Sequence, residues 1–143
     1  MAYSGKVIQR MPAWESDTSL ITADWRQSPN NASILARYAS HVEEDNDKKE
    51  NLYLKALSIY PDFFGAHYDL ARLYFSQHRY TLAYKHFNQA SERKASDDIQ
   101  YNLTLCRYHI VRNKSQSAYA SNQLDDAIEL LDSARSIFPG DRV

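Results

Sequence analysis

The sequence is poor in the residues that make tight turns and covalent cross-links. Among its 143 residues there are 3 glycines, 4 prolines and 1 cysteine. So few glycines and prolines argue against an all-β fold, in which many short strands are joined by tight turns. The single cysteine, Cys106, excludes an internal disulfide and a zinc site built from cysteines. No run of about 18 apolar residues is present, so the sequence predicts no membrane span.

An excess of charge of one sign is also lacking. The chain has 17 basic and 18 acidic residues, which gives a formal net charge of −1. This balance argues against nucleic acid or an anionic membrane as the main partner. Hydrophobic residues make up 43% of the chain, which is enough for a packed core, and 11 tyrosines offer both packing area and polar tips.

The motifs of catalytic and metal sites are missing as well. The five histidines form neither an H-x3-H pair nor an H-E-x2-H motif, and there is no glycine-rich phosphate loop and no G-x-S-x-G motif. The acidic run at residues 43–50 lacks the glycine of a calcium loop and predicts a solvated turn before a helix. We therefore predict no enzyme activity, no metal and no cofactor, and any catalytic part would lie outside this chain.

What the sequence does contain is helical periodicity with an internal repeat. In the clearest unit, at residues 64–95, the first helix carries three large residues and one small one: His67, Leu70, Ala71 and Tyr74. The second helix carries two small residues around a large one: Ala83, Phe87 and Ala90. The small residues let two antiparallel helices approach closely, and the large ones fill the gaps. This spacing resembles the tetratricopeptide repeat, with His67 in place of its Trp and Ala71 in place of its Gly.

The resemblance extends to both neighbouring segments. Tyr53 and Ala56 lie 34 residues before Phe87 and Ala90. The family implies an all-α, right-handed helical solenoid of about three helix-turn-helix repeats plus a leading helix. The predicted boundaries are an extended segment at 1–13, a degenerate leading helix at 14–28, and repeats at 32–61, 64–95 and 98–139 within a domain at 14–143.

The third repeat is about ten residues too long. Ala134 follows Ala90 by 44 residues instead of 34. We place the extra residues at 113–123, where Ser, Asn and Gln favour a polar loop over a lengthened helix. Pro139, Gly140 and Asp141 resemble a junction between repeats, which predicts either a longer parent protein or an array without its final cap.

In tetratricopeptide repeat arrays, a concave groove lined mainly by the first helix of each pair binds peptides or helices. The resemblance therefore implies a protein- or peptide-binding scaffold. The positions predicted to face the groove are Arg37, Tyr68, Arg72, Phe75, Tyr101, Leu105, Tyr108 and His109. Aromatic and arginine side chains suit such a surface because they bury much area and make directional hydrogen bonds. The alternative is that these aromatic residues only pack against neighbouring helices.

One subgroup of the family grips acidic C-terminal peptides with a Lys/Asn/Arg clamp on the first helices. Here Asp69 places a negative charge near a position where such clamps carry a neutral or basic group. We therefore predict that the chain does not bind ligands of that kind.

A narrower resemblance concerns the N-terminal segment. It is similar to the junction between the last membrane span and the repeat tail of multi-pass, O-mannosyltransferase-like membrane proteins. The matching residues are Arg10, Trp14, Pro29, Asn31 and Ala32, whereas Met11 and Ile21 depart from the pattern. This resemblance implies an alternative function, an accessory extracytoplasmic tail of a membrane glycosyltransferase-like protein. Without it, a cytoplasmic location is expected.

A third alternative is self-association through an open end of the array. The ends of a repeat array are apolar where no neighbour covers them. The segments 14–25 and 127–138 are the predicted ends, and a homo-oligomer would form through one of them.

Overall fold

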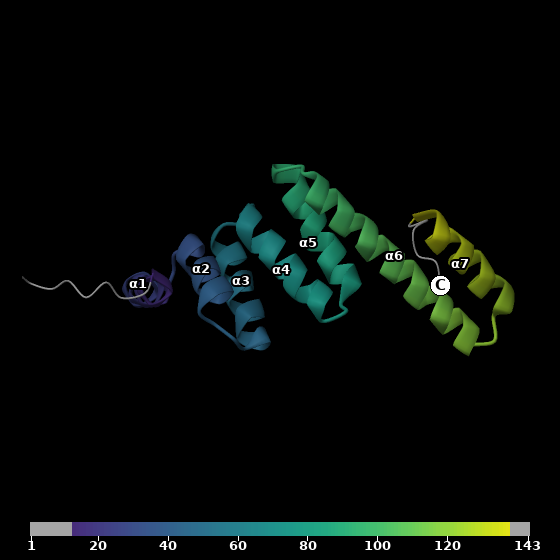
Figure 1. Ribbon diagram of the computed structural model, residues 1–143, viewed down its shortest axis with the longest axis horizontal. Coiled ribbons are helices and arrows are strands. Elements are labelled where there is room, and N and C mark those ends of the chain that lie inside the picture. Colours follow the sequence, from purple (N-terminus) through teal and green to yellow (C-terminus); the bar gives the residue numbers. More distant parts are fainter. Residues whose placement is uncertain (1–12, 138–143) are drawn as a thin grey trace, which may run out of the picture.

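The computed structural model describes residues 13–137, and their side chains from Asp17 onward. This part of the chain forms α-helices and no strands, which confirms the predicted all-α, tetratricopeptide-type fold. The helices are α1 (Ala13–Gln27), α2 (Ala32–His41), α3 (Asn46–Ile59), α4 (Phe64–Ser76), α5 (Tyr80–Arg93), α6 (Asp97–Ala120) and α7 (Leu124–Ile137) (Figure 1).

The helices lie in a row and pack mainly on their neighbours in sequence. α2–α3, α4–α5 and α6–α7 are helical hairpins, and α1 stands alone before them (Figure 1). α2 also contacts α4, so the first helices of successive hairpins touch. α1 occupies the region predicted as a leading helix, with Ile21 buried and the Trp25 ring stacked 4.4 Å from that of Tyr38. Most of the segment predicted as extended, including Arg10 and Met11, lies outside the described residues.

Short polar side chains fix where several helices begin. Asn31 Oδ1 accepts hydrogen bonds from the backbone N–H groups of residues 33 and 34 at the start of α2. Asp45 Oδ1 does the same for Asp47 and Lys48 at the start of α3, at 2.9 and 3.1 Å. Such caps satisfy donors that the first turn of a helix leaves unpaired. The acidic run at 43–50 is therefore a turn that leads into a helix.

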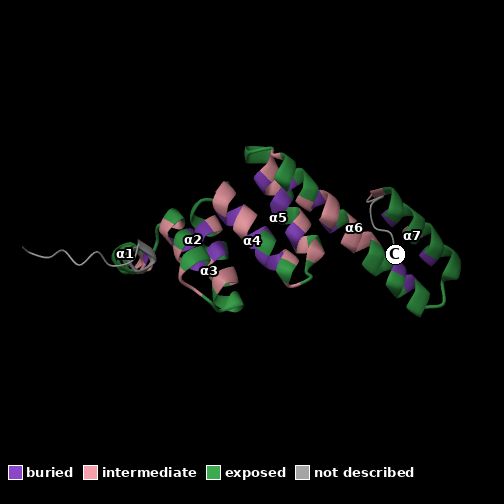
Figure 2. Ribbon diagram, viewed as in Figure 1, coloured by how far each residue is buried: buried purple, intermediate pink, exposed green. Residues whose placement is uncertain are grey.

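Small residues form the seams between the helices. Six alanines from four helices are fully buried, with exposed fractions of 0%: Ala39, Ala56, Ala66, Ala71, Ala83 and Ala90. Leu35, Leu70 and Phe87 fill the space between these close contacts, and the buried positions face inward between the helices (Figure 2). This core runs without a break from α2 into the first half of α6.

The predicted polar loop in the third repeat is wrong. α6 continues to Ala120, so the segment 113–123 is helical except for its last three residues. Ser115 and Ala118 are buried within this segment, and Ser115 Oγ donates a hydrogen bond to the carbonyl oxygen of Ala127 on α7. The Ser, Asn and Gln residues suggested a loop, but packing against α7 outweighs weak intrinsic propensity.

α6 is longer than α4 by 24 − 13 = 11 residues. Eleven residues make about three turns of α-helix, so the helix returns to nearly the same face and gains about 16 Å in length. One stripe of α6 can therefore serve two different neighbours along its length.

The two halves of α6 follow two registers. In the first half, buried residues lie 33 positions after buried residues of α4: Ile99 after Ala66, Leu103 after Leu70, and Cys106 after Leu73. In the second half the offset is 44, because the turn residue Asn122 (φ 59°) matches His78 (φ 60°). The difference, 44 − 33 = 11, equals the added length. α5 packs on α6 in the first register and α7 packs on it in the second.

Candidate functional site

The eight predicted groove residues lie on the first helices α2, α4 and α6. Arg37, Arg72 and Tyr101 are exposed. The others are half-buried: Tyr68, Phe75, Leu105, Tyr108 and His109. None of the eight is fully buried, so part of each remains on the surface.

Tyr68 links the middle hairpin to the start of α6. Its hydroxyl donates a hydrogen bond to the carboxylate of Asp98, and this bond, together with burial, raises the pKa of Tyr68. Its ring lies 5.8 Å from that of Phe87, edge-on. The guanidinium of Arg72 lies 5.9 Å from the centre of the Tyr68 ring. Arg72 is thus a surface cation on an aromatic side chain that packing and a hydrogen bond hold in place.

Asp69 gives this face a negative charge as well. It is half-buried, and burial raises the pKa of its carboxyl group against the opposing influence of Arg72 and His41. The surface near α2 and α4 therefore carries both signs of charge. Arg37 and His41 also line a hollow of about 350 Å³ between α1 and α2.

Three of the predicted groove aromatics belong to a packing cluster. The Phe75 ring lies 5.3 Å from that of Tyr80 and 5.7 Å from that of His109. The rings of Tyr80 and His109 stack at 4.3 Å, and Tyr108 meets His109 at 5.3 Å. This cluster joins α4, α5 and α6. Phe75 and His109 therefore hold neighbouring helices together, which is the alternative that the sequence left open for the aromatic residues.

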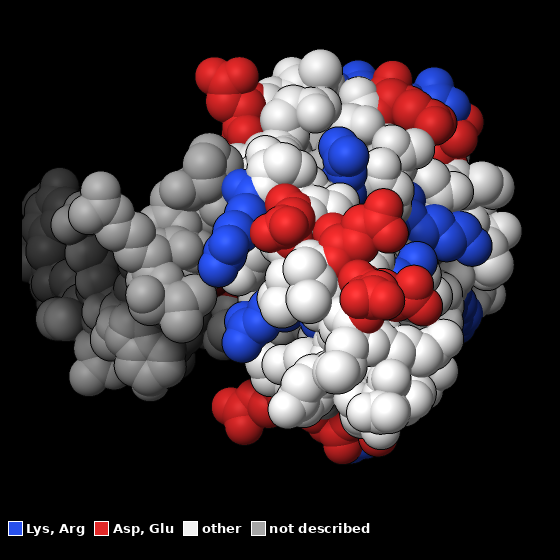
Figure 3. All heavy atoms as spheres, turned by 90° about the vertical axis from the view of Figure 1, so that its right-hand side faces the viewer, with Lys and Arg blue, Asp and Glu red and all other residues white. Residues whose placement is uncertain are grey.

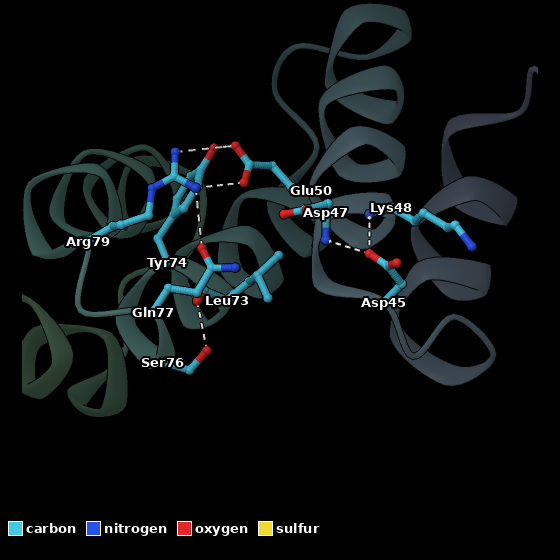
Figure 4. Close-up of polar contacts among 9 residues, drawn as sticks. All are labelled: Asp45, Asp47, Lys48, Glu50, Leu73, Tyr74, Ser76, Gln77 and Arg79. Carbon is cyan, nitrogen blue, oxygen red and sulfur yellow. Dashed lines mark hydrogen bonds and ion pairs between the residues drawn. The ribbon is translucent and has the colours of Figure 1, made fainter.

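A network around Glu50 fastens α3 to the next hairpin (Figure 4). Tyr74 donates its hydroxyl hydrogen to Glu50 Oε1 at 2.9 Å, and Arg79 Nη1 donates to Glu50 Oε2 at 2.6 Å. The Arg79 guanidinium also lies 4.4 Å from the centre of the Tyr74 ring. Burial raises the pKa of Glu50, but the bonds from Arg79 and Tyr74 outweigh it and the pKa is lowered.

Two histidines meet inside the α4–α5 hairpin. His67 Nδ1 and His86 Nδ1 are 2.9 Å apart, and His67 Nε2 is 2.7 Å from the carbonyl oxygen of Pro61. His67 Nε2–H therefore donates to Pro61, and His86 Nδ1–H donates to His67. Burial, together with the nearby charges of His67 and Lys85, lowers the pKa of His86 to about 4. The pair is a structural contact, and no group of three metal-ligating side chains occurs in the part of the chain that the structure describes.

A groove of about 1000 Å³ opens at the other end of the array. The start of α5 closes one end of it, the second half of α6 forms its floor, and α7 forms a wall. Its charged lining residues are Arg79, Lys114, Asp126 and Glu129, and its apolar ones include Leu82, Ile110 and Leu130. The surface at the α7 end carries both acidic and basic groups between uncharged areas (Figure 3).

The sequence does not predict this groove, because the Ser, Asn and Gln residues at 113–123 favour a loop there. One signal was available. The excess of the third repeat is close to eleven residues, or three helical turns, which a longer helix accommodates without turning its buried face outward.

Comparison with known proteins identifies one repeat directly. The tetratricopeptide repeat family matches residues 52–85, from the second half of α3 through α4 into α5. A search of curated proteins returns no match to the chain. None of the helices within residues 13–137 is long and apolar enough to cross a membrane. Tetratricopeptide repeats typically form non-catalytic scaffolds and generally mediate protein–protein interaction. The chain therefore contains a tetratricopeptide repeat at residues 52–85, within a longer stack of helical hairpins.

Proposed function

We propose that this domain binds a protein or peptide on the face formed by α2, α4 and α6. The observation that carries the proposal is the position of Arg72. It is exposed on the middle first helix of the array, over a tyrosine ring whose hydroxyl is anchored to Asp98. A pre-positioned arginine on an aromatic platform loses little side-chain entropy on binding.

The charges on this face indicate the kind of ligand. Arg37 and Arg72 suit bidentate hydrogen bonds to Asp or Glu side chains of a peptide. Asp69 lies beside Arg72, which supports the prediction that purely acidic C-terminal peptides are not the ligands. Tyr101, with 53% of its surface exposed, adds apolar area at the α6 end. A peptide of mixed charge with at least one apolar anchor fits these groups.

The test is a pull-down from an extract of the source cells, read by mass spectrometry. The bait proteins are the wild-type domain and the double variant Arg72→Glu/Tyr101→Ala, which changes two exposed side chains and leaves the Phe75 cluster intact. Arg135→Glu on α7 is the matched control, since Arg135 is also exposed. We expect proteins that bind the wild type and the control to be lost from the double variant. Identical sets of bound proteins on all three baits would refute the proposal.

Self-association is a second candidate, because one stripe of α7 is apolar and exposed. Leu124, Ile128 and Leu131 have exposed fractions of 50%, 59% and 48%. They lie at helical spacing on one side of α7. Light scattering across a wide concentration range tests this candidate, and a monomer at the highest concentration excludes it.

A further inference from the structure

We infer that the groove between the start of α5, the second half of α6 and α7, here called the α6–α7 groove, receives an α-helix of a partner protein. The helix would sit there as α3 sits on the α4–α5 hairpin. This site is separate from the face formed by α2, α4 and α6. The inference can therefore be tested independently of the function proposed for that face.

The α4–α5 and α6–α7 hairpins are equivalent in their turns and in their small buried residues. Both turns have a residue with φ near +60°, His78 or Asn122, followed by a backbone bond back to the preceding helix: Arg79 N to Tyr74 O, and Gln123 N to Ala118 O, both 2.9 Å. Three small buried residues coincide at an offset of 44: Ala71 with Ser115, Ala83 with Ala127, and Ala90 with Ala134. The second half of α6 and α7 therefore repeat α4 and α5.

In the first hairpin, the equivalent surface is covered by a helix, α3. α3 packs against α4, and Glu50 of α3 accepts hydrogen bonds from Tyr74 and Arg79 (Figure 4). The positions equivalent to Lys114, Ser117, Ala118 and Leu130 are all buried there: Leu70, Leu73, Tyr74 and His86. In the second hairpin the same positions line an open groove. This geometry is thus already used once in the chain to hold a helix.

The open surface of α6 is long enough for a short helix. α5 begins at Tyr80, which stacks on His109 near the middle of α6. The second half of α6 extends past this point, where α7 packs against it but α5 no longer runs alongside. The added eleven residues provide about 16 Å, which matches about three turns of a helix lying alongside.

The groove has charged residues at positions that are apolar in the first hairpin. Lys114 stands where the first hairpin has Leu70, and Asp126 stands where it has Leu82. Polar groups at these positions suit a partner that binds and leaves rather than a permanent core helix. Asp126 and Glu129 line the groove from α7, one turn apart, and Lys114 lines it from α6. The partner helix should therefore have a narrow apolar edge, basic residues on the side facing α7, and an acidic residue facing Lys114.

The probe is a phage-displayed library of 14-residue, alanine-based helices in which the positions of one face are randomised. Selection on the wild-type domain is expected to enrich helices with Lys or Arg beside an apolar stripe. Fluorescence anisotropy with synthetic copies of the enriched peptides then gives their affinities. A copy with proline at its centre is the control for the helical requirement.

Two variants of the groove test the site. Ser117→Trp fills it from an exposed position, so the fold should survive, and we expect at least a tenfold loss of affinity. Asp126→Lys/Glu129→Lys reverses the wall charge and should weaken binding by a similar factor. Peptides with Glu in place of Lys should recover affinity for this variant. Circular dichroism confirms that both variants retain the helical fold.

The outcomes separate this site from the other surfaces. Binding that survives Ser117→Trp and the charge reversal, or a selection that yields no groove-dependent helix, would overturn the inference. So would a wild-type dimer that Ser117→Trp converts to monomer, because the occupant would then be a second copy of the chain. Arg72→Glu should leave the affinity of the selected helices unchanged, whereas a loss there would place them on the face formed by α2, α4 and α6.

Discussion

The α4–α5 and α6–α7 hairpins have the same turn and small residues at the same contact positions, yet they differ in how much of their large side chains they bury. Phe87 in α5 is 1% exposed, whereas Leu131, its equivalent in α7, is 48% exposed. α4–α5 has α3 on one side and α6 on the other. Within the described residues, α7 is followed by no further helix.

This difference separates two features of a repeat: closure of the hairpin, which its own residues determine, and burial of its large side chains, which depends on neighbouring helices. A turn with a positive φ and three small residues is enough to close a hairpin. Burial of the large residues depends on the next helix in the stack, as expected for an array in which each repeat contacts mainly its neighbours. Equivalent substitutions in the two hairpins should therefore have unequal effects.

The largest expected contrast is between Phe87 and Leu131. Phe87→Ala should lower the free energy of unfolding by about 3–5 kcal/mol, because it leaves a cavity in the core. Leu131→Ala removes a side chain that is half exposed and should cost less than about 1 kcal/mol. Urea unfolding followed by circular dichroism measures both. Equal losses would mean that another surface covers α7 in solution.

A smaller contrast concerns pH, because His86 is buried in the first hairpin and its equivalent, Leu130, does not titrate. The pKa of His86 falls from 6.5 to about 4 on folding, so the unfolded chain binds the proton more tightly. The free energy of unfolding should therefore fall by roughly 2 kcal/mol as the pH drops from about 6.5 to 4.

The matched variant for this pH effect is His86→Asn, whose amide can still donate to His67. In it, the loss between those pH values should shrink relative to the wild type. A wild-type slope equal to that of His86→Asn would contradict the assignment.

Ser115 offers a third comparison, because it occupies the seam position that Ala71 holds in the first hairpin. Ser115→Ala removes the hydrogen bond to the carbonyl oxygen of Ala127. It should lower the free energy of unfolding by about 1 kcal/mol or less, since that carbonyl lies within a helix and alanine fits the seam. Ser115→Leu should cost more, through overpacking. Thermal unfolding of the two variants distinguishes a polar contact from a purely spatial requirement.

The smallest expected effect lies in the turns. Asn122→Gly should raise the free energy of unfolding by about 0.5 kcal/mol, because glycine adopts a positive φ without strain. His78→Gly should gain less, since it loses the contact between His78 Nδ1 and the Tyr80 hydroxyl at 2.8 Å. Ser121→Gly is the control, because its φ is −87° and glycine should destabilise the turn there. Chemical denaturation of all three variants, measured side by side, tests the order.

Much of the fold could be predicted from residue spacing. The small residues at Ala71, Ala83 and Ala90 and the large ones between them are a local pattern, and it predicts closely packed antiparallel helices wherever it occurs. The predicted groove residues were harder to assign. Spacing places Phe75 and His109 on first helices, but it does not predict that both rings pack against Tyr80 and against each other.

The sequence by itself therefore determined the helical repeat, because its period and its small-residue seams arise within single helices and pairs. It also determined the excess length of the third repeat. Only the tertiary structure decided where that length lies, because the same Ser- and Asn-rich segment can form a loop or, with α7 packed against Ser115 and Ala118, about two further turns of α6. That packing energy comes from residues more than ten positions away, and it is what opens the α6–α7 groove.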